Sequence, residues 1–356
     1  MQYHASGYHG PIPSLVDDSQ ALAHPVTRLL ARSMDLSLYT LLWISFQYLV
    51  LRWHGTGGTF DSLLVSYISF VLMIFVEPLL LTTWGTTPGK AILGLKLRND
   101  DGTKLSYGEG VARTFGVFAD GYGYGVPIYN IVRAFRCYKT SEKGEAMPWD
   151  EGLEYRIRDE RIYRWFVFAL AFAAGLMLAY NVALLAQLPR HRGDLTAAAY
   201  AANVNDVLSR PDFRGYPYRM TETGQWVRYD QGMPVNVHFL MEGRPPGHRL
   251  TLSDGIVTAV SFEVESTADS WLHSYASQKH LMALAFMASQ RELKPRELFR
   301  QNLDYSDMSS YTKQIGIVSI EQRAEIRGYW EAAGRLIPIE GEERYFHLLF
   351  SMQKTQ

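Results

Sequence analysis

The chain has 356 residues, of which 47% are hydrophobic, and its formal net charge is −1. A near-neutral chain offers no electrostatic case for nucleic-acid binding, and a single cysteine, Cys137, excludes an intrachain disulfide and a multi-cysteine metal site. The mean hydropathy of −0.12 averages two different halves: residues 1–190 contain long apolar runs, whereas residues 191–356 have the composition of a globular domain.

Residues 1–23 are polar and contain scattered glycine and proline, which predicts a mobile tail. This stretch lacks the apolar core of a cleavable signal peptide, so we expect export of any later part to depend on an internal helix. Two apolar segments follow, Met34–Leu51 and Leu63–Trp84. Each is close to the roughly 20 residues that cross the hydrocarbon, and the glycine-rich turn between them predicts an antiparallel helix pair.

Charged residues at the start of the first span share one helix face. Arg28 and Asp35 are seven residues apart, and Arg32 lies three before Asp35. One interpretation is a buried Arg28–Asp35 ion pair or an ion-binding carboxylate. The other is that both arginines are ordinary cytoplasmic flanks and Asp35 lies among the lipid headgroups.

The second span also carries a carboxylate, Glu77, directly before Pro78. Proline removes a backbone hydrogen bond and kinks a helix. Glu77 lies about eight residues from the end of its span, which is roughly 12 Å deeper than that end. Asp35 and Glu77 could therefore line one polar track at two depths. Alternatively, Glu77 faces a neighbouring helix and is either protonated or paired with Arg28 or Arg32.

The segment after the second span is predicted to form a short hairpin, with Leu93–Arg98 and Lys104–Leu105 as strands. Val111–Val132 is apolar but contains Arg113, Asp120 and a glycine-rich run. Because basic residues flank it on both sides, we expect two half-helices that re-enter or lie on the membrane, and a full span is the second choice.

A third span is predicted at Tyr163–Leu188, and three crossings from a cytoplasmic amino terminus put residues 190–356 outside the cytoplasm. The expected fold is a membrane α-helical domain of three spans plus a re-entrant or surface segment, followed by a soluble α+β domain. The expected divisions are a tail at 1–23, the membrane domain at 24–155, the third transmembrane helix at 156–189 and the extracytoplasmic domain at 190–356.

The C-terminal part predicts alternating strands and helices. Helices are expected at Thr196–Leu208, Ser270–Arg291 and Pro295–Leu303, and strands at Gln225–Tyr229, Val235–Met241, Arg249–Leu252, Ile256–Val264, Ile315–Ile320, Glu325–Glu331 and Tyr345–Met352, with a tight turn at Asp254-Gly255. Four of its histidines, His238, His273, His280 and His347, do not form a metal-ligand pair such as H-E-x-x-H. With no nucleophile elbow, phosphate loop or dinucleotide fingerprint, we expect neither an enzyme nor a metal or other cofactor.

The charged residues and glycines of the first half follow a recognisable pattern. It consists of R-x-x-A-x-x-x-D at Arg28, Ala31 and Asp35, then Gly85, Thr87, Gly89, Lys90, Leu93, Gly94, Leu95 and Lys96, then Asp101-Gly102, and finally Arg113. On these residues, 24–155 resembles the RDD family of bacterial integral membrane proteins. The resemblance implies a second aspartate near the end of the module, where Asp150 fits and Asp120 competes.

The resemblance implies a protein of the bacterial cytoplasmic (inner) membrane, in a family associated with transport that includes sodium/proton exchange. The ion-pair or transport candidates are Arg28, Asp35, Glu77, Asp120 and Asp150. The protein would either transport a monovalent cation or a proton, or respond to such an ion. Three spans are few for a solute pathway, so transport would require a homo-oligomer. The alternative is a membrane-anchored binding or scaffold module whose periplasmic domain contacts an envelope partner.

Overall fold

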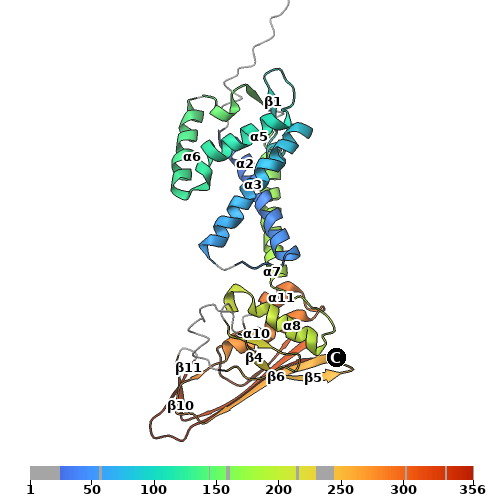
Figure 1. Cartoon of the computed structure of the whole chain (residues 1–356), viewed down its shortest axis with the longest axis vertical. Helices are drawn as coiled ribbons and strands as arrows, with labels where there is room; N and C mark the ends of the chain where they lie inside the picture. Colours follow the sequence, from blue (N-terminus) through green and yellow to red (C-terminus); the bar gives the residue numbers. More distant parts are fainter. Residues whose placement is uncertain are drawn as a thin grey trace, which may run out of the picture. The chain divides into compact units, whose positions relative to one another are not determined.

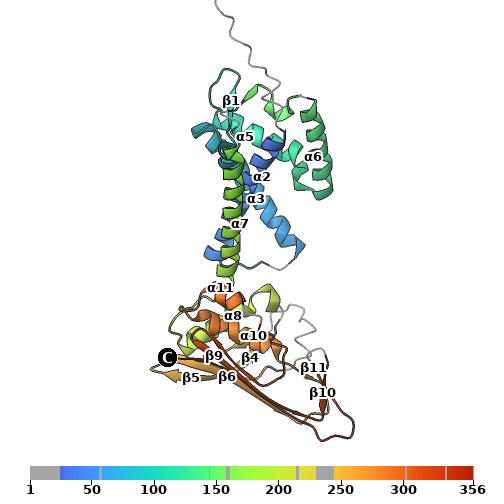
Figure 2. The ribbon, with the colours of Figure 1, turned by 180° about the vertical axis from the view of Figure 1, so that it is seen from behind.

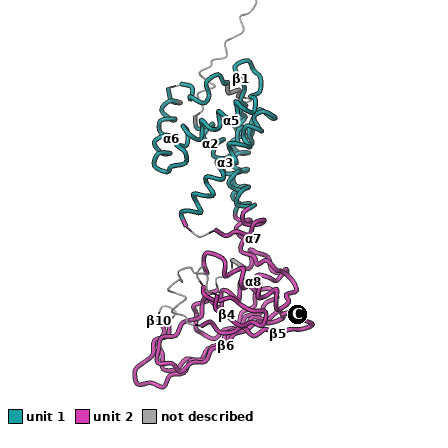
Figure 3. Tube along the Cα trace, viewed as in Figure 1, with its two compact units in different colours: residues 1–46, 59–179 teal, residues 47–58, 180–356 magenta. Residues whose placement is uncertain are grey.

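The computed structural model describes residues 25–55, 58–143, 145–157, 161–213, 216–229, 244–300, 303–332 and 335–355. The tail expected at 1–23 and the strand expected at Val235–Met241 lie outside these residues. The chain forms two compact units (Figure 3). Unit 1 comprises residues 1–46 and 59–179, and unit 2 comprises residues 47–58 and 180–356. Each unit is described by itself.

Unit 1 is mainly helical (Figure 1). Its elements are α2 (Pro25–Ser45), α3 (Thr59–Thr83), α4 (Pro88–Ile92), β1 (Leu95–Asn99), α5 (Tyr107–Gly116), α6 (Pro127–Glu142), β2 (Leu153–Ile157) and most of α7 (Tyr163–Ala186). The start of α7 is held against α4, because Arg164 Nη1 donates to the carbonyls of Ala91 and Ile92 at 3.0 and 3.1 Å.

Within the described residues, two helices are long and apolar enough to cross a membrane, α3 and α7. They correspond to the second and third predicted spans. The first predicted span, Met34–Leu51, is not among them. It is divided between α2, which carries Arg28, Arg32 and Asp35, and a π-helical turn at Phe46–Val50. The membrane-type character of α3 and α7 is therefore confirmed, and a third crossing stays a prediction.

The predicted hairpin is wrong in its second strand. β1 pairs antiparallel with β2, from Leu95 opposite Ile157 to Asn99 opposite Leu153. The turn after β1 does form, because Gly102 N donates to Asn99 O at 2.7 Å. Lys104–Leu105 does not extend as a strand because Ser106 immediately caps α5, in a reciprocal capping box with Glu109.

Residues 108–136 form two helices separated by a break, as expected. α5 ends in a π-helical turn (Val117–Gly121), a 3₁₀ turn follows at Gly123–Gly125, and α6 starts at Pro127. All three residues of the 3₁₀ turn have positive φ values, of 53°, 56° and 75°. Such backbone cannot continue an α-helix, which excludes one uninterrupted helix across this segment.

Unit 2 contains an antiparallel five-stranded sheet in the order β5-β6-β12-β9-β8 and a three-stranded sheet in the order β10-β11-β7. The strands are β3 (Tyr218–Met220), β4 (Trp226–Arg228), β5 (Arg249–Ser253), β6 (Ile256–Ser266), β7 (Leu272–His273), β8 (Tyr311–Ile315), β9 (Val318–Arg327), β10 (Tyr329–Ala332), β11 (Arg335–Pro338) and β12 (Tyr345–Lys354). The helices α8 (Ala197–Leu208), α10 (Ala276–Ala285) and α11 (Pro295–Arg300) lie on one side of the large sheet (Figure 2).

The core of unit 2 lies between this sheet and these helices. Alternate residues of β12, including Phe346, Leu348 and Phe350, are fully buried, whereas the residues between them are partly exposed. This period-2 pattern is typical of a sheet with one covered face. Tyr200 of α8 and Leu281 of α10 are buried in the same core. The α+β character expected for this part of the chain is thus observed as a sheet-rich domain.

Several predicted elements of unit 2 have different bounds. The helix predicted at Ser270–Arg291 is shorter, because β7 pairs with β11 and Tyr275, with a φ of 55°, precedes α10. The strand predicted at Ile315–Ile320 is instead a hairpin of β8 and β9 that turns at Gly316 (φ 53°), and Gly328 (φ 67°) separates β9 from β10. The tight turn at Asp254-Gly255 is confirmed, with positive φ at both residues.

Candidate functional site

A buried cluster of charged side chains lies at the centre of unit 1, around Glu77. Glu77 is inaccessible to solvent. Its Oε1 accepts from Lys90 Nζ at 2.7 Å and from Arg113 Nη1 at 3.4 Å, and its Oε2 pairs with Arg32 Nη1. Glu77 therefore interacts with three cations from three different helices, α2, α4 and α5. Of the alternatives left open by the sequence, the structure shows the pairing with Arg32.

Asp150 belongs to the same cluster. It lies on a 3₁₀ turn (Pro148–Asp150) and pairs with Arg28 and with Arg113, whose Nη2 is 2.9 Å from Asp150 Oδ1. Asp120 lies outside the cluster, because its carboxylate is half-exposed and pairs with Arg133 at 2.7 Å. The structure thus brings Asp150, and not its competitor Asp120, to the charged residues of α2.

The buried Arg28–Asp35 ion pair, one of the interpretations left open by the sequence, is not observed among the described residues. Asp35 instead accepts from Thr87 Oγ1 at 2.5 Å and from the backbone N–H of Gly89 at 2.7 Å. Both donors belong to the start of α4, where unpaired N–H groups favour a carboxylate. This approach requires a glycine, because a Cβ on Gly89 would lie 2.2 Å from the carbonyl oxygen of Ala31.

These contacts join into one network. Lys90 Nζ lies 3.4 Å from Thr87 Oγ1, so the Asp35–Thr87 pair is linked through Lys90 to Glu77, and from there through Arg113 to Asp150. The family-motif residue Gly94 lies apart, at the turn between α4 and β1 with a φ of 78°. Instead of facing a shared open track, Asp35 and Glu77 are each held by protein donors.

This arrangement connects α2, α3, α4, α5 and the turn before β2 by charge-assisted hydrogen bonds, which are strong in a low-dielectric interior. Among the residues that the structure describes, no group of three or more His, Cys, Asp and Glu side chains could hold a metal ion. Sequence reasoning placed Arg32 within reach of Asp35 and of Glu77, but its contact with Met73 Sδ at 3.5 Å was not foreseen.

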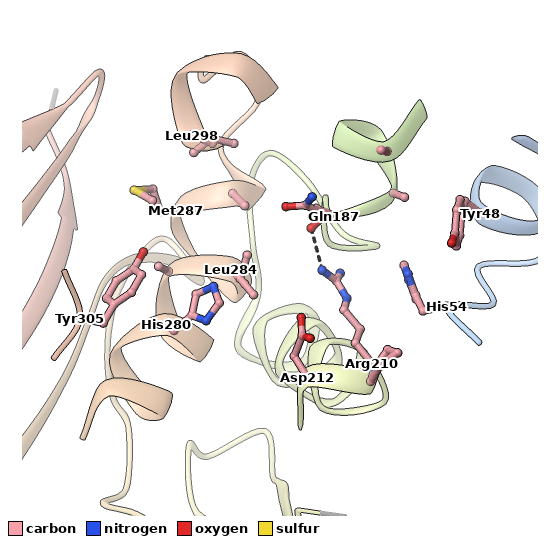
Figure 4. Close-up of a pocket in the computed structure, with 15 residues that line it drawn as sticks. Tyr48, His54, Gln187, Arg210, Asp212, His280, Leu284, Met287, Leu298 and Tyr305 are labelled. Atoms are coloured by element: carbon pink, nitrogen blue, oxygen red, sulfur yellow. Dashed lines mark hydrogen bonds between the residues drawn. The ribbon is translucent and has the colours of Figure 1, made fainter. Parts of the chain in front are cut away.

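Unit 2 contains a separate cavity of about 500 Å³ (Figure 4). Segments far apart in the sequence form it. Tyr48 and His54 come from the segment after α2, Arg210 and Asp212 from the turn after α8, and His280 from α10. Apolar side chains complete the lining, among them Leu284, Met287 and Leu298. Its size is within the range typical of small-molecule sites.

Two polar atoms of this cavity's lining are buried and lack a hydrogen-bond partner among the described residues, His54 Nε2 and Arg210 Nε. The remaining guanidinium nitrogens of Arg210 are engaged, and Nη1 donates to Gln187 O at 2.8 Å. The ring of His280 stacks on Tyr305 with centroids 5.1 Å apart. Burial lowers the pKa values of His54 and His280, which favours neutral imidazoles that can both donate and accept.

Sequence reasoning missed this cavity. It considered His280 only as a possible metal ligand, and no local motif marks His54 or Arg210. A glycine-flanked histidine and an Arg-Pro-Asp turn are ordinary loop residues, and only the tertiary fold brings them together.

Two apolar membrane-type helices and a buried charge cluster define unit 1 as the core of an α-helical membrane protein. The model of the RDD family matches residues 22–193, a stretch that includes both of these helices. The match extends beyond the expected boundary at residue 155 and includes all of α7. No family model matches the C-terminal region. The chain has no match among curated proteins or among solved structures.

Proposed function

We propose that this protein is a membrane-anchored binding protein whose C-terminal unit binds a polar ligand or partner segment in the cavity of unit 2. The observation that carries this proposal is the pair of buried polar atoms, His54 Nε2 and Arg210 Nε, that line the cavity without a hydrogen-bond partner in the part of the chain that the structure describes. Leaving buried polar atoms unpaired is unfavourable, and a ligand that hydrogen-bonds to them would relieve this.

The charge cluster of unit 1 supports an anchoring role for that unit. Each of its three carboxylates, Asp35, Glu77 and Asp150, accepts from protein donors. An anchor needs stable contacts between helices, which such pairs supply, whereas a cation pathway needs a carboxylate that exchanges partners. The proposed role involves no catalysis.

The proposed location is the bacterial inner membrane, with the amino terminus in the cytoplasm and unit 2 outside it. α3 and α7 supply two crossings, and α2 with its π-helical extension, uncharged after Asp35, supplies the third. A cysteine at Ser253, in a Cys137→Ser background, should react with an impermeant thiol reagent in intact cells. Labelling only after lysis would contradict this topology.

Site-specific cross-linking of the full-length chain in its membrane tests the binding role. A photoreactive residue at Leu284, which lines the cavity, should give a discrete adduct. The matched control is Val227 on β4, which is exposed and lies outside the cavity lining. His280→Phe keeps a ring against Tyr305 but removes both nitrogens, and it should reduce the adduct. Equal adducts from Leu284 and Val227, or none from Leu284, would contradict the proposal.

Transport of a monovalent cation or proton, by a homo-oligomer, is the second candidate. The continuous network from Asp35 through Lys90 and Glu77 to Asp150 favours it, because linked ionisable groups can relay charge. Purified protein in liposomes should then move sodium or protons down an imposed gradient, and Glu77→Gln should abolish this flux. Flux that persists in a Glu77→Gln, Asp35→Asn double variant would exclude this network as the path.

A further inference from the structure

The three-stranded sheet of unit 2 presents two exposed tryptophans on one face. Trp330 lies on β10 and Trp271 directly precedes β7, and their side chains are 51% and 55% exposed. The strands β10 and β11 lie at one end of unit 2 (Figure 2). Neither tryptophan lines the cavity around His54 and Arg210. Large apolar side chains that gather on one exposed face typically mark a binding surface.

The strand register places both indoles in one row across this sheet. Trp330 lies opposite Ile337 in the pairing of β10 with β11. β11 pairs in turn with β7, Leu336 opposite Leu272, so the next position along each strand puts Ile337 beside Trp271. Side chains alternate between the two faces of a sheet. Trp330, Ile337 and Trp271 therefore share the exposed face, whereas Leu336 and Leu272 are buried on the other.

This row crosses the whole width of the three-stranded sheet. Neighbouring strands are about 4.8 Å apart, so the backbones of the two tryptophans are separated by roughly 10 Å, with Ile337 between them. Arg335, two residues before Ile337 on β11, has its guanidinium carbon 5.7 Å from the centre of the Trp271 ring. This cation–π contact orients the indole, which stays more than half exposed. The result is a narrow apolar strip with an aromatic ring at each end.

The size of this strip favours a narrow ligand over a protein. A tryptophan buries at most about 250 Å², and only about half of each of these two is exposed. A stable protein interface buries about 800 Å² on each partner. The sugar rings of a β-1,4-linked glycan are narrow, and their flat faces carry C–H bonds whose slightly positive hydrogens pack against the negative face of an aromatic ring. Every second sugar of such a chain presents the same face, at a repeat close to the separation of the two tryptophans.

We propose that this tryptophan row, formed by Trp271, Ile337 and Trp330, binds a β-1,4-linked glycan chain. One sugar ring would stack on each indole, and the sugar between them would lie over Ile337. The hydroxyl groups at the edges of the sugars would stay in contact with water, so the row needs few polar side chains of its own. This inference does not depend on the proposed function of the cavity in unit 2.

Isothermal titration calorimetry of the full-length protein, in a detergent without a sugar headgroup, tests the proposal. The probes are cellotetraose and the β-1,4-linked tetramer of N-acetylglucosamine, with the α-1,4-linked maltotetraose as the linkage control. At least one β-linked tetramer should bind, and at least tenfold more tightly than maltotetraose, whose curved chain cannot follow a straight row. Trp271→Ala and Trp330→Ala should each weaken this binding by about tenfold or more, as expected when a tryptophan at a hot spot is truncated. Tyr229→Ala removes an exposed ring outside the row and is the matched control, with unchanged binding.

Chain length gives a second readout, which a loss of folding could not mimic. A disaccharide reaches one indole and a tetrasaccharide reaches both, so wild-type affinity should rise at least tenfold between them within one β-linked series. This rise should vanish in Trp330→Ala, whereas Trp330→Tyr keeps a ring and should retain most of it. No binding of either β-linked tetramer, equal binding of maltotetraose, or unchanged binding in both alanine variants would overturn the proposal. Dimerisation that both alanine variants abolish would show a contact between copies of the chain and would also overturn it.

Discussion

Neutralising Glu77 should destabilise unit 1 strongly. The carboxylate is inaccessible and lies among Arg32, Lys90 and Arg113, so Glu77→Gln leaves three buried cations without their shared counter-ion. Breaking a buried ion pair costs about 3–5 kcal/mol. The amide oxygen still accepts a hydrogen bond from Lys90, so we expect the lower end, about 3 kcal/mol. For a unit of this size that corresponds to a melting temperature lower by roughly 6 °C or more.

The assay is thermal unfolding of the purified full-length protein in detergent, followed by the loss of the monodisperse peak in size-exclusion chromatography. Asp120→Asn is the matched control, because it makes the same change from carboxylate to amide in a half-exposed pair with Arg133. An exposed pair contributes about 0–1 kcal/mol. If Glu77→Gln and Asp120→Asn unfold at the same temperature, the assignment of the charge cluster as the stabilising centre of unit 1 is refuted.

Three further predictions follow from single contacts. A double-mutant cycle of Arg28→Gln and Asp150→Asn should give a coupling energy of about 1–3 kcal/mol, and additive losses would contradict the observed pair. Gly89→Ala should lower the melting temperature by several degrees because its Cβ meets a backbone carbonyl, whereas Gly108→Ala, with open space around it, should stabilise by about 0.5–1 kcal/mol. Burial lowers the pKa of Lys279 to about 8, whereas its pKa in the unfolded chain is near 10.4. Between these two pH values the unfolded state binds more protons than the folded state, so the free energy of unfolding should rise with pH. Lys279→Met should remove that rise in urea titrations.

The sequence pattern predicted most members of the charge cluster but not which side chains pair with each other. Helix spacing correctly places Arg28 and Asp35 on one face of α2. It carries no information about α4, whose first N–H groups and Thr87 hydroxyl occupy Asp35. It also cannot show that Asp150, far along the chain, reaches Arg28. Pairing in a buried network depends on tertiary contacts that local periodicity does not encode.

The predictions of strand partners and helix bounds were wrong for a related reason. A β-strand gains its stability from its neighbour, and β1 finds that neighbour in β2, more than fifty residues away, instead of in the adjacent Lys104–Leu105. Elements fixed by local chemistry were predicted well. The helix expected to begin at Thr196 does so with that threonine as its cap, and the Asp254-Gly255 turn has the backbone that those residues favour.

The pairing of β1 with β2 has a consequence for exchanging the C-terminal domain of this chain. β2 ends six residues before α7 starts, so the strand that completes the small sheet of unit 1 directly precedes the helix that leads to unit 2. A graft that joins a foreign C-terminal domain at residue 155 would cut β2 in its middle and leave β1 with an unpaired edge. A functional chimaera should therefore keep the native chain through Ala186 and accept the new domain only after α7.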